Sequence, residues 1–294
     1  MNTLEPVTAL SLKNILLATD FSPGSETAVK YALAIARRHA SRVHAIHVNS
    51  PDSYNLLDPD AFAITLNGPQ ANSKNISDVL HGLLTGLPSQ TPTRQGAVWE
   101  VISDVVRRNE IDLLVLASHG RHGIPRLVLG SVAEEVFRNV SCPVLTVGPD
   151  VKPCNSREMK IKKVLLATHF EAGSTAPVHA ALLCNEFGAE LTVLHVADEN
   201  KVSSHGKTSK RLVQQLTSVV PPEACLWQKP ACVLKHGLPS ANILEAAQQM
   251  RADLIVLGAR HPEPARINSH LPWATAARVI AEAECPVLTV RQED

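Results

Sequence analysis

Aromatic residues are scarce in this chain of 294 residues, at 3% of the sequence. Proteins that bind single-stranded nucleic acid stack the bases on aromatic side chains and follow the backbone with a basic groove. An excess of basic charge is absent as well, because 28 Lys and Arg residues balance 28 Asp and Glu residues. No net field therefore favours a polyanion, and nucleic acid is not expected as a partner.

The chain also lacks an uncharged apolar run of membrane-spanning length, and its first residues do not join a basic start to a continuous apolar stretch. These absences predict an unexported protein without a membrane partner. Its six cysteines are dispersed with no Cys-x-x-Cys pair, which suits reduced thiols better than a disulfide framework or a thiolate zinc site. We therefore expect a cytoplasmic location.

What the chain does contain is a repeat of itself. The segment 13–25, KNILLATDFSPGS, recurs at 162–174 as KKVLLATHFEAGS. Three further pairs keep the same order: HAIHV at 44–48 with TVLHV at 192–196, IDLLVL at 111–116 with ADLIVL at 252–257, and CPVLTV at both 142–147 and 285–290. Four matched blocks indicate a duplication, with domains expected at 1–149 and 158–294 and a linker in the proline-containing, non-periodic segment 148–157.

Each matched block is short, mostly apolar and rich in β-branched residues, which is typical of strands buried on both faces of a parallel sheet. Helical patterns lie between the blocks, over 25–40, over 98–109 and from Ser131 onward, where Ser131 and Glu134 have capping-box spacing. Alternation of strands and helices predicts an α/β fold with two tandem doubly wound, mainly parallel sheets.

Ligands of such sheets collect beyond the carboxyl ends of strands where the strand order reverses. In the first half the segment after the first strand is Ala18-Thr19-Asp20. The segment after the fourth strand is Ala117-Ser-His-Gly120, and nine residues separate Gly120 from Gly130-Ser131. Gly120, Gly130 and the start of the helix could form a phosphate cradle, and Asp20 could accept hydrogen bonds from an exocyclic amine or a ribose hydroxyl. The alternatives are a plain turn at Asp20 and a simple helix cap at Ser131.

At these residues the sequence resembles the universal stress protein family. The resemblance occurs once in each half and together covers essentially the whole chain. Its nucleotide-binding members carry Gly-x-x-Gly, nine residues, then Gly-Ser or Gly-Thr. The resemblance implies five-stranded sheets and an ATP site in the first half, with Mg²⁺ or Mn²⁺ held mainly through the phosphates and no dedicated protein metal site. The site residues that it implies are Ala18, Thr19, Asp20, Val48, Ala117, Ser118, His119, Gly120, Arg121, Gly130, Ser131 and Val132.

Ala117 departs from the family pattern, because it stands where the first glycine is expected. Its methyl group is tolerable if the backbone there has a negative φ and the ligand leaves about a methyl's width. The second half departs further: His169 replaces the aspartate, Gly258-Ala-Arg-His261 replaces the glycine pair, and Trp273-Ala274 replaces Gly-Ser. We therefore expect the second copy to be degenerate.

Three functions remain open from the sequence. The first is an ATP-binding regulatory or stress-response protein, the second a nucleotide-free dimerisation scaffold, and the third a slow ATP hydrolase. No nucleophile is assembled with a base, so no catalytic residue is predicted. The resemblance also implies that the strands at 144–147 and 287–290 pair within the chain as a pseudo-dimer, and that two chains associate as a homodimer.

Overall fold

The computed structural model describes residues 10–20, 22–49, 82, 84–90, 93–118, 131–155, 159–170, 173–197, 207–224, 226–259 and 271–291. The strands of the first half are β1 (Asn14–Ala18), β2 (Arg42–Asn49), β3 (Ser89–Gln90), β4 (Thr93–Gln95), β5 (Leu113–Ala117) and β6 (Val144–Val147). Its helices are α1 (Pro23–His39), α4 (Val98–Arg108) and α5 (Ser131–Asn139).

The second half repeats this order. Its strands are β7 (Lys163–Ala167), β8 (Glu190–Ala197), β9 (Ala231–His236), β10 (Leu254–Ala259) and β11 (Val287–Arg291). Its helices are α6 (Ala176–Phe187), α7 (Lys207–Thr217), α8 (Pro239–Met250) and α9 (Leu271–Glu282), with a short 3₁₀ turn, η3, at Pro222–Ala224. The predicted α/β, doubly wound, mainly parallel fold is confirmed, but the two expected five-stranded sheets are joined in one sheet to which the first half contributes six strands.

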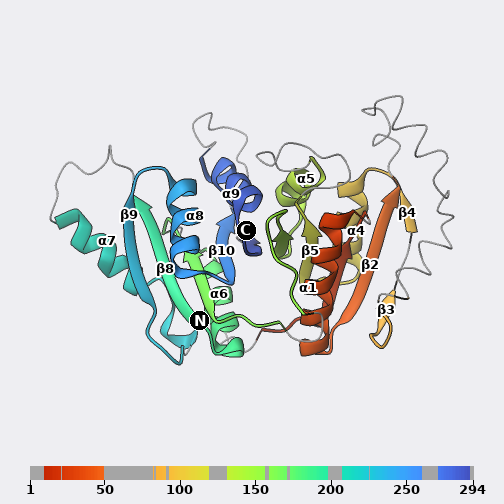
Figure 1. The fold of residues 1–294 in the computed structure, drawn as a ribbon, viewed down its shortest axis with the longest axis horizontal. Helices are drawn as coiled ribbons and strands as arrows, with labels where there is room; N and C mark the ends of the chain where they lie inside the picture. Colours follow the sequence, from red (N-terminus) through yellow and green to blue (C-terminus); the bar gives the residue numbers. More distant parts are fainter. Residues whose placement is uncertain are drawn as a thin grey trace, which may run out of the picture.

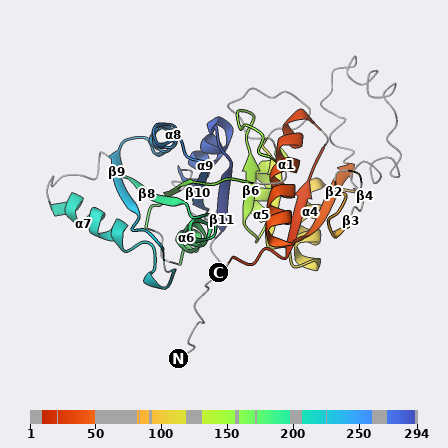
Figure 2. The ribbon, with the colours of Figure 1, turned by 60° about the horizontal axis from the view of Figure 1, so that its bottom comes forward.

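All the strands belong to one sheet in the order β3-β2-β1-β5-β6-β11-β10-β7-β8-β9, with β4 also paired to β2. The pairs within each half are parallel, whereas β6 and β11 are antiparallel, with Leu145 opposite Leu288. Figures 1 and 2 show these two strands in the middle of the molecule, with β9 and β3 at the two ends. The implied pairing of the last strands is thus confirmed, and it makes the halves an intrachain pseudo-dimer.

Side-chain hydrogen bonds reinforce this seam between β6 and β11. Arg291 is buried, and its Nη1 donates to the carbonyl oxygen of Val140 at 2.9 Å. Thr289, also buried, donates from Oγ1 to the carbonyl oxygen of Val144 at 3.3 Å. Each bond joins residues more than 140 positions apart, so the two halves are held in one register.

Two apolar layers cover the continuous sheet. One contains α1 and α6, whose buried residues pack with Leu145 and Leu288 on the same face. The other contains α4, α5, α8 and α9 on the opposite face. The central strands carry buried apolar residues on both faces, which is why they read as continuous apolar runs in the sequence.

Local sequence explains the limits of the two equivalent helices. Ser22 is the N-cap of α1, where its side chain accepts the N–H of Ser25, and Pro23 follows in the first turn. Both helices end on a left-handed residue, which is Ala40 in α1 and Gly188 in α6. Glycine adopts this conformation without the steric cost that alanine has.

Candidate functional site

The strand order of the first half reverses between β1 and β5. These strands pair in parallel, with Leu17 opposite Val115, while β2 lies beyond β1 and β6 lies beyond β5. In folds of this kind ligands bind outside the carboxyl ends of the strands at such a reversal, and we call this region, beyond the ends of β1 and β5, the candidate crevice. The sequence-predicted residues Ala18 and Ala117 end these two strands, and Val48 lies near the end of β2.

Hydrogen bonds fix the segment that follows β1. The N–H of Thr19 donates to the carbonyl oxygen of Ile46 at 3.1 Å, and Nδ1 of His47 lies 2.9 Å from the carbonyl oxygen of Thr19. Oγ1 of Thr19 donates to Oγ of Ser25 at 3.1 Å. Thr19 is itself buried, and these bonds fix the backbone and the side chain directly after β1.

Asp20 adopts the turn conformation that was the alternative to base recognition. Its Oδ1 accepts the N–H of Ser22 at 3.0 Å, next to the cap of α1. The carboxylate is half-buried, and a carboxylate has about four lone-pair sites. The turn therefore fixes the position of Asp20 and is compatible with a donor group on a ligand.

The two residues at the end of β5 complete the described part of the crevice. Ala117 lies in an extended strand opposite Val147, so the negative φ required to accommodate its methyl group is present. Ser118 is buried, and its N–H donates to the carbonyl oxygen of Val147 at 3.0 Å. His119, Gly120, Arg121 and Gly130 lie outside the described residues, as do the side chains of Ser131 and Val132, although α5 begins at Ser131.

The second half has the same frame between β7 and β10, and a ring contact lies next to it. Nδ1 of His195 lies 2.8 Å from the carbonyl oxygen of Thr168, as in the His47–Thr19 pair of the first half. The Phe170 ring, held at a φ of +63°, packs on His195 with ring centroids 4.3 Å apart. The remaining space beside Thr168 and Gly258 is about 10 Å³, which is room for one water molecule.

Gly258 occupies the strand-end position that Ala117 has in the first half. A Cβ on Gly258 would lie 3.0 Å from Oγ of Ser174, so the neighbouring hydroxyl would have to move. In the first half the equivalent hydroxyl, on Ser25, is directed to Thr19 and to the carbonyl oxygen of Ser22.

The sequence did not identify the contact between the β2 histidine and the loop after β1. His47 and Val48 repeat as His195 and Val196, and this repetition was the signal available. Among the described residues, no group of three or more His, Cys, Asp or Glu side chains could hold a metal ion. Within the same part of the chain, none of the helices is both long enough and apolar enough to cross a membrane.

Known proteins share both the sequence pattern and the fold. A universal stress protein of Methanocaldococcus jannaschii is 29% identical over 140 residues, which are 46% of this chain and 81% of that protein. Universal stress protein A of Escherichia coli strain K12 is 30% identical over 117 residues, which are 37% of this chain and 78% of that protein. The crystal structure of a universal stress protein from Archaeoglobus fulgidus covers 98% of this chain and 99% of its own, with a TM-score of 0.69 at 19% identity.

The model of the universal stress protein family matches the chain twice, at residues 11–148 and at residues 160–291. The first segment contains the strands β1 to β6, and the second contains the strands β7 to β11. The two segments are in contact where β6 pairs with β11. The protein is therefore a tandem member of the universal stress protein family.

Proposed function

We propose that this protein binds ATP in its first half and acts as a regulatory protein of the stress response. The supporting observation is the reversal of strand order between β1 and β5, with the carboxylate of Asp20 fixed after β1 and α5 beginning after β5. In the second half the aspartate and the Gly-Ser pair are replaced by His169 and by Trp273-Ala274. This difference in sequence favours one nucleotide per chain.

Each described residue has a distinct part in the proposed site. Ala18 and Val48 are half-buried apolar residues at the ends of β1 and β2, and they suit the face of an adenine ring. Asp20 accepts from the exocyclic amine or a ribose hydroxyl. The N-terminus of α5 offers N–H donors and the positive end of the helix dipole to phosphates.

The rest of the proposed site rests on the family resemblance. It assigns ribose and phosphate contacts to the 118–121 segment and to Gly130, Ser131 and Val132. Mg²⁺ or Mn²⁺ would bind mainly through the phosphates, in keeping with the described residues, which gather no acidic metal cluster. Regulation would depend on whether nucleotide is bound and would not require its hydrolysis. We therefore assign no catalytic residue.

The remaining proposals concern the context of the chain. The five described cysteines are free thiols, which supports a reducing compartment such as the cytoplasm. We place the domains at 1–149 and 158–294, with the linker between them, and we propose that two chains associate as a homodimer. Because β6 and β11 already pair with each other, such association would use another surface.

The first experiment measures the adenine nucleotide released from the purified, denatured protein, followed by titration of ATP with Mg²⁺ by calorimetry. We expect about one ATP per chain, and weaker binding in Asp20→Ala and Gly130→Val. His169→Ala is the matched control, because His169 stands at the position of Asp20 in the second half. Binding that is lost in His169→Ala and kept in Asp20→Ala would contradict the assignment to the first half.

Two other results would favour the alternatives. Absence of released nucleotide, together with absence of heat at millimolar ATP, would favour the scaffold. Steady phosphate release that disappears in Asp20→Ala, while circular dichroism shows an intact fold, would favour a slow hydrolase. Each result is read on the full chain, so the contribution of the second half is included.

A further inference from the structure

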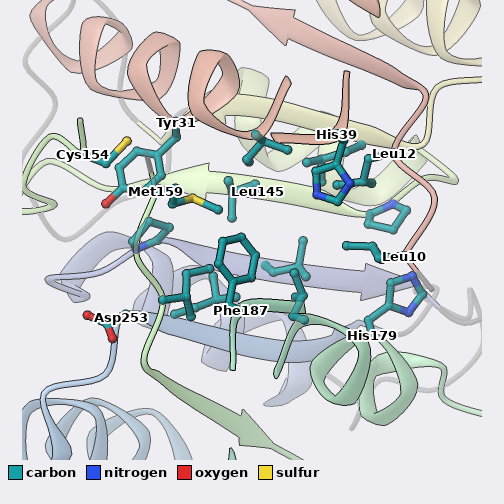
Figure 3. A pocket seen from close by; sticks show the side chains of 18 of the residues that line it. Leu10, Leu12, Tyr31, His39, Leu145, Cys154, Met159, His179, Phe187 and Asp253 are labelled. Carbon is teal, nitrogen blue, oxygen red and sulfur yellow. The ribbon is translucent and has the colours of Figure 1, made fainter. Parts of the chain in front are cut away.

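A cavity of about 610 Å³ lies between the two halves, over the seam of β6 and β11. Figure 3 shows it between α1 and α6, with Leu145 of β6 at its floor. It reaches the segments that precede β5, β6, β10 and β11, at the opposite end of β5 from the proposed nucleotide crevice. Its volume is within the range of about 300–1,000 Å³ found for small-molecule sites.

Matching faces of the two equivalent helices form its walls. Tyr31, Ile35 and His39 line it from α1, and His179, Leu183 and Phe187 line it from α6. Both sets have the spacing i, i+4, i+8, which places them on one face of each helix. The antiparallel pairing of β6 and β11 brings these two faces opposite one another.

Most of the lining is uncharged. Besides the aliphatic side chains, three thiols face the space, and burial raises the pKa of Cys142 to about 12, of Cys154 to about 11 and of Cys285 to about 12. These thiols stay protonated at neutral pH and behave as small, weakly polar groups. Met159, a flexible side chain just after the linker, also lines the space.

Polar groups are grouped at the two ends of the cavity. Figure 3 shows Tyr31 and Asp253 toward one end, and His39 and His179 toward the other. The Tyr31 hydroxyl donates to the carbonyl oxygen of Lys152 at 3.2 Å, which leaves its oxygen as an acceptor. Nδ1 of His179 lies 3.0 Å from the carbonyl oxygen of Thr175, which leaves Nε2 for another partner.

The charged groups of the lining do not favour an ion of either sign. Two lysines, Lys152 and Lys160, are opposed by the three carboxylates of Asp112, Asp253 and Glu284. Asp253 is engaged by the N–H groups of Lys162 and Lys163, at 2.8 and 3.0 Å. A charged ligand would lose its hydration without gaining a matching partner, whereas an uncharged one would lose little.

We propose that this cavity binds an uncharged, elongated and mainly apolar small molecule with a terminal hydrogen-bonding group, such as a hydroxyl. The apolar body lies between the α1 and α6 faces, and the polar end meets Tyr31 or His179. This site is distinct from the proposed nucleotide site, since it lies between α1 and α6 over the seam, shares no lining residue with that site and takes a ligand of opposite character. Occupation would also stabilise the contact between the two halves, because both of them contribute walls.

The test uses the full chain and the neutral fluorescent probe N-phenyl-1-naphthylamine, displaced by dodecanol or by dodecanoate. These competitors share one chain length and differ in charge. We expect saturable probe binding at one site per chain, and displacement by dodecanol at a concentration at least about tenfold lower than by dodecanoate, a difference of about 1.4 kcal/mol. Absence of saturable binding, or stronger displacement by dodecanoate, would overturn the proposal.

Variants locate the probe. Met159→Trp fills the cavity and should weaken probe binding by about tenfold or more. Val213→Trp is the matched control, because Val213 is 43% exposed on α7, away from the cavity, and it should bind like the wild type. If thermal unfolding shows that Met159→Trp is misfolded, Leu10→Trp tests the same space from the N-terminal segment. Unchanged probe binding in a correctly folded Met159→Trp or Leu10→Trp protein would show that the probe does not occupy this cavity. Loss of probe binding when two chains associate would show that a second chain, and not a small molecule, occupies it.

Discussion

Arg38 of α1 and Glu186 of α6 connect the two halves directly. Nε of Arg38 lies 2.7 Å from Oε1 of Glu186, and Nη2 of Arg38 donates to the Glu186 carbonyl oxygen at 2.6 Å. Nε2 of His39 lies 2.9 Å from the same Oε1, and the Arg38 guanidinium is stacked 4.2 Å from the centroid of the Phe187 ring. One glutamate thus joins two basic side chains across the seam, beside the cavity that His39 and Phe187 line.

Arg38→Ala should lower the free energy of unfolding by about 1 kcal/mol. The Arg38 side chain is 40% exposed, so solvent screens the ion pair, and the loss of the carbonyl hydrogen bond and the Phe187 contact adds to the effect. Urea unfolding measures the change. Arg107→Ala is the control, since Arg107 is 80% exposed and pairs only within its own helix with Asp104. Equal losses in the free energy of unfolding would show that the link between the halves contributes no more stability than an exposed ion pair within one helix.

The same link predicts a pH dependence. Burial alone raises the pKa of the Glu186 carboxyl, but hydrogen bonds from His39 and Arg38 outweigh it and hold that pKa below the ordinary value of 4.5. Because the folded pKa is the lower one, the stabilisation is complete above pH 4.5 and is lost as the pH falls through the folded value. The difference in stability between wild type and Glu186→Gln should therefore be largest near neutral pH and shrink below pH 4.5. Urea midpoints of both proteins across this range measure it, and a constant difference would contradict the assignment.

The helix ends offer a matched pair of substitutions. Ala40 has a φ of +51° at the end of α1, where the second copy has Gly188 with a φ of +62°. Ala40→Gly should leave stability unchanged or raise it by up to about 1 kcal/mol, because the strain of a left-handed alanine is removed. Gly188→Ala should lower stability by about 1 kcal/mol for the opposite reason. Thermal unfolding of both variants checks the signs, and destabilisation by Ala40→Gly would be the contrary result.

Gly148→Ala should destabilise the seam. A Cβ on Gly148 would lie 2.9 Å from the carbonyl oxygen of Ile280 in α9, and a backbone atom cannot move aside as the end of a side chain can. We expect a loss of about 1–3 kcal/mol, as for overpacking in a core. Gly82→Ala is the control, because no atom of the described residues lies within 4 Å of the corresponding position. Chemical unfolding distinguishes the two, and a neutral Gly148→Ala would mean that α9 relaxes easily.

Much of the fold could be predicted because the chain repeats itself. The blocks at 13–18 and 142–147, and their copies, became β1, β6, β7 and β11, and the helix predicted over 98–109 is α4 with its end one residue earlier. The edge strands were missed. β9 is half-exposed and contains Lys235, and β3 and β4 have two and three residues, so none of them forms a buried apolar run. Strands of this kind depend on their neighbour more than on their own sequence.

The candidate site was predictable in position and less so in detail. Parallel strands end at one edge, so the approach of Ala18 and Ala117 follows from topology alone. The burial of Thr19 and the turn bond of Asp20 depend on His47 and Ser22, whose placement needs the folded chain. The cavity could not be predicted, because Tyr31 and His179 look like ordinary helix residues until β6 and β11 bring their helices together.

The β6–β11 pairing has a consequence for the chemistry of assembly. β6 contains four residues and β11 five, and the pairing of two separate domains through such a contact would depend on their concentration. A connecting segment keeps their effective concentration at roughly the millimolar level, whatever the abundance of the protein. The stoichiometry of the two copies is thereby fixed at one to one. Each copy can therefore diverge in sequence while it remains paired with the other copy of the same chain.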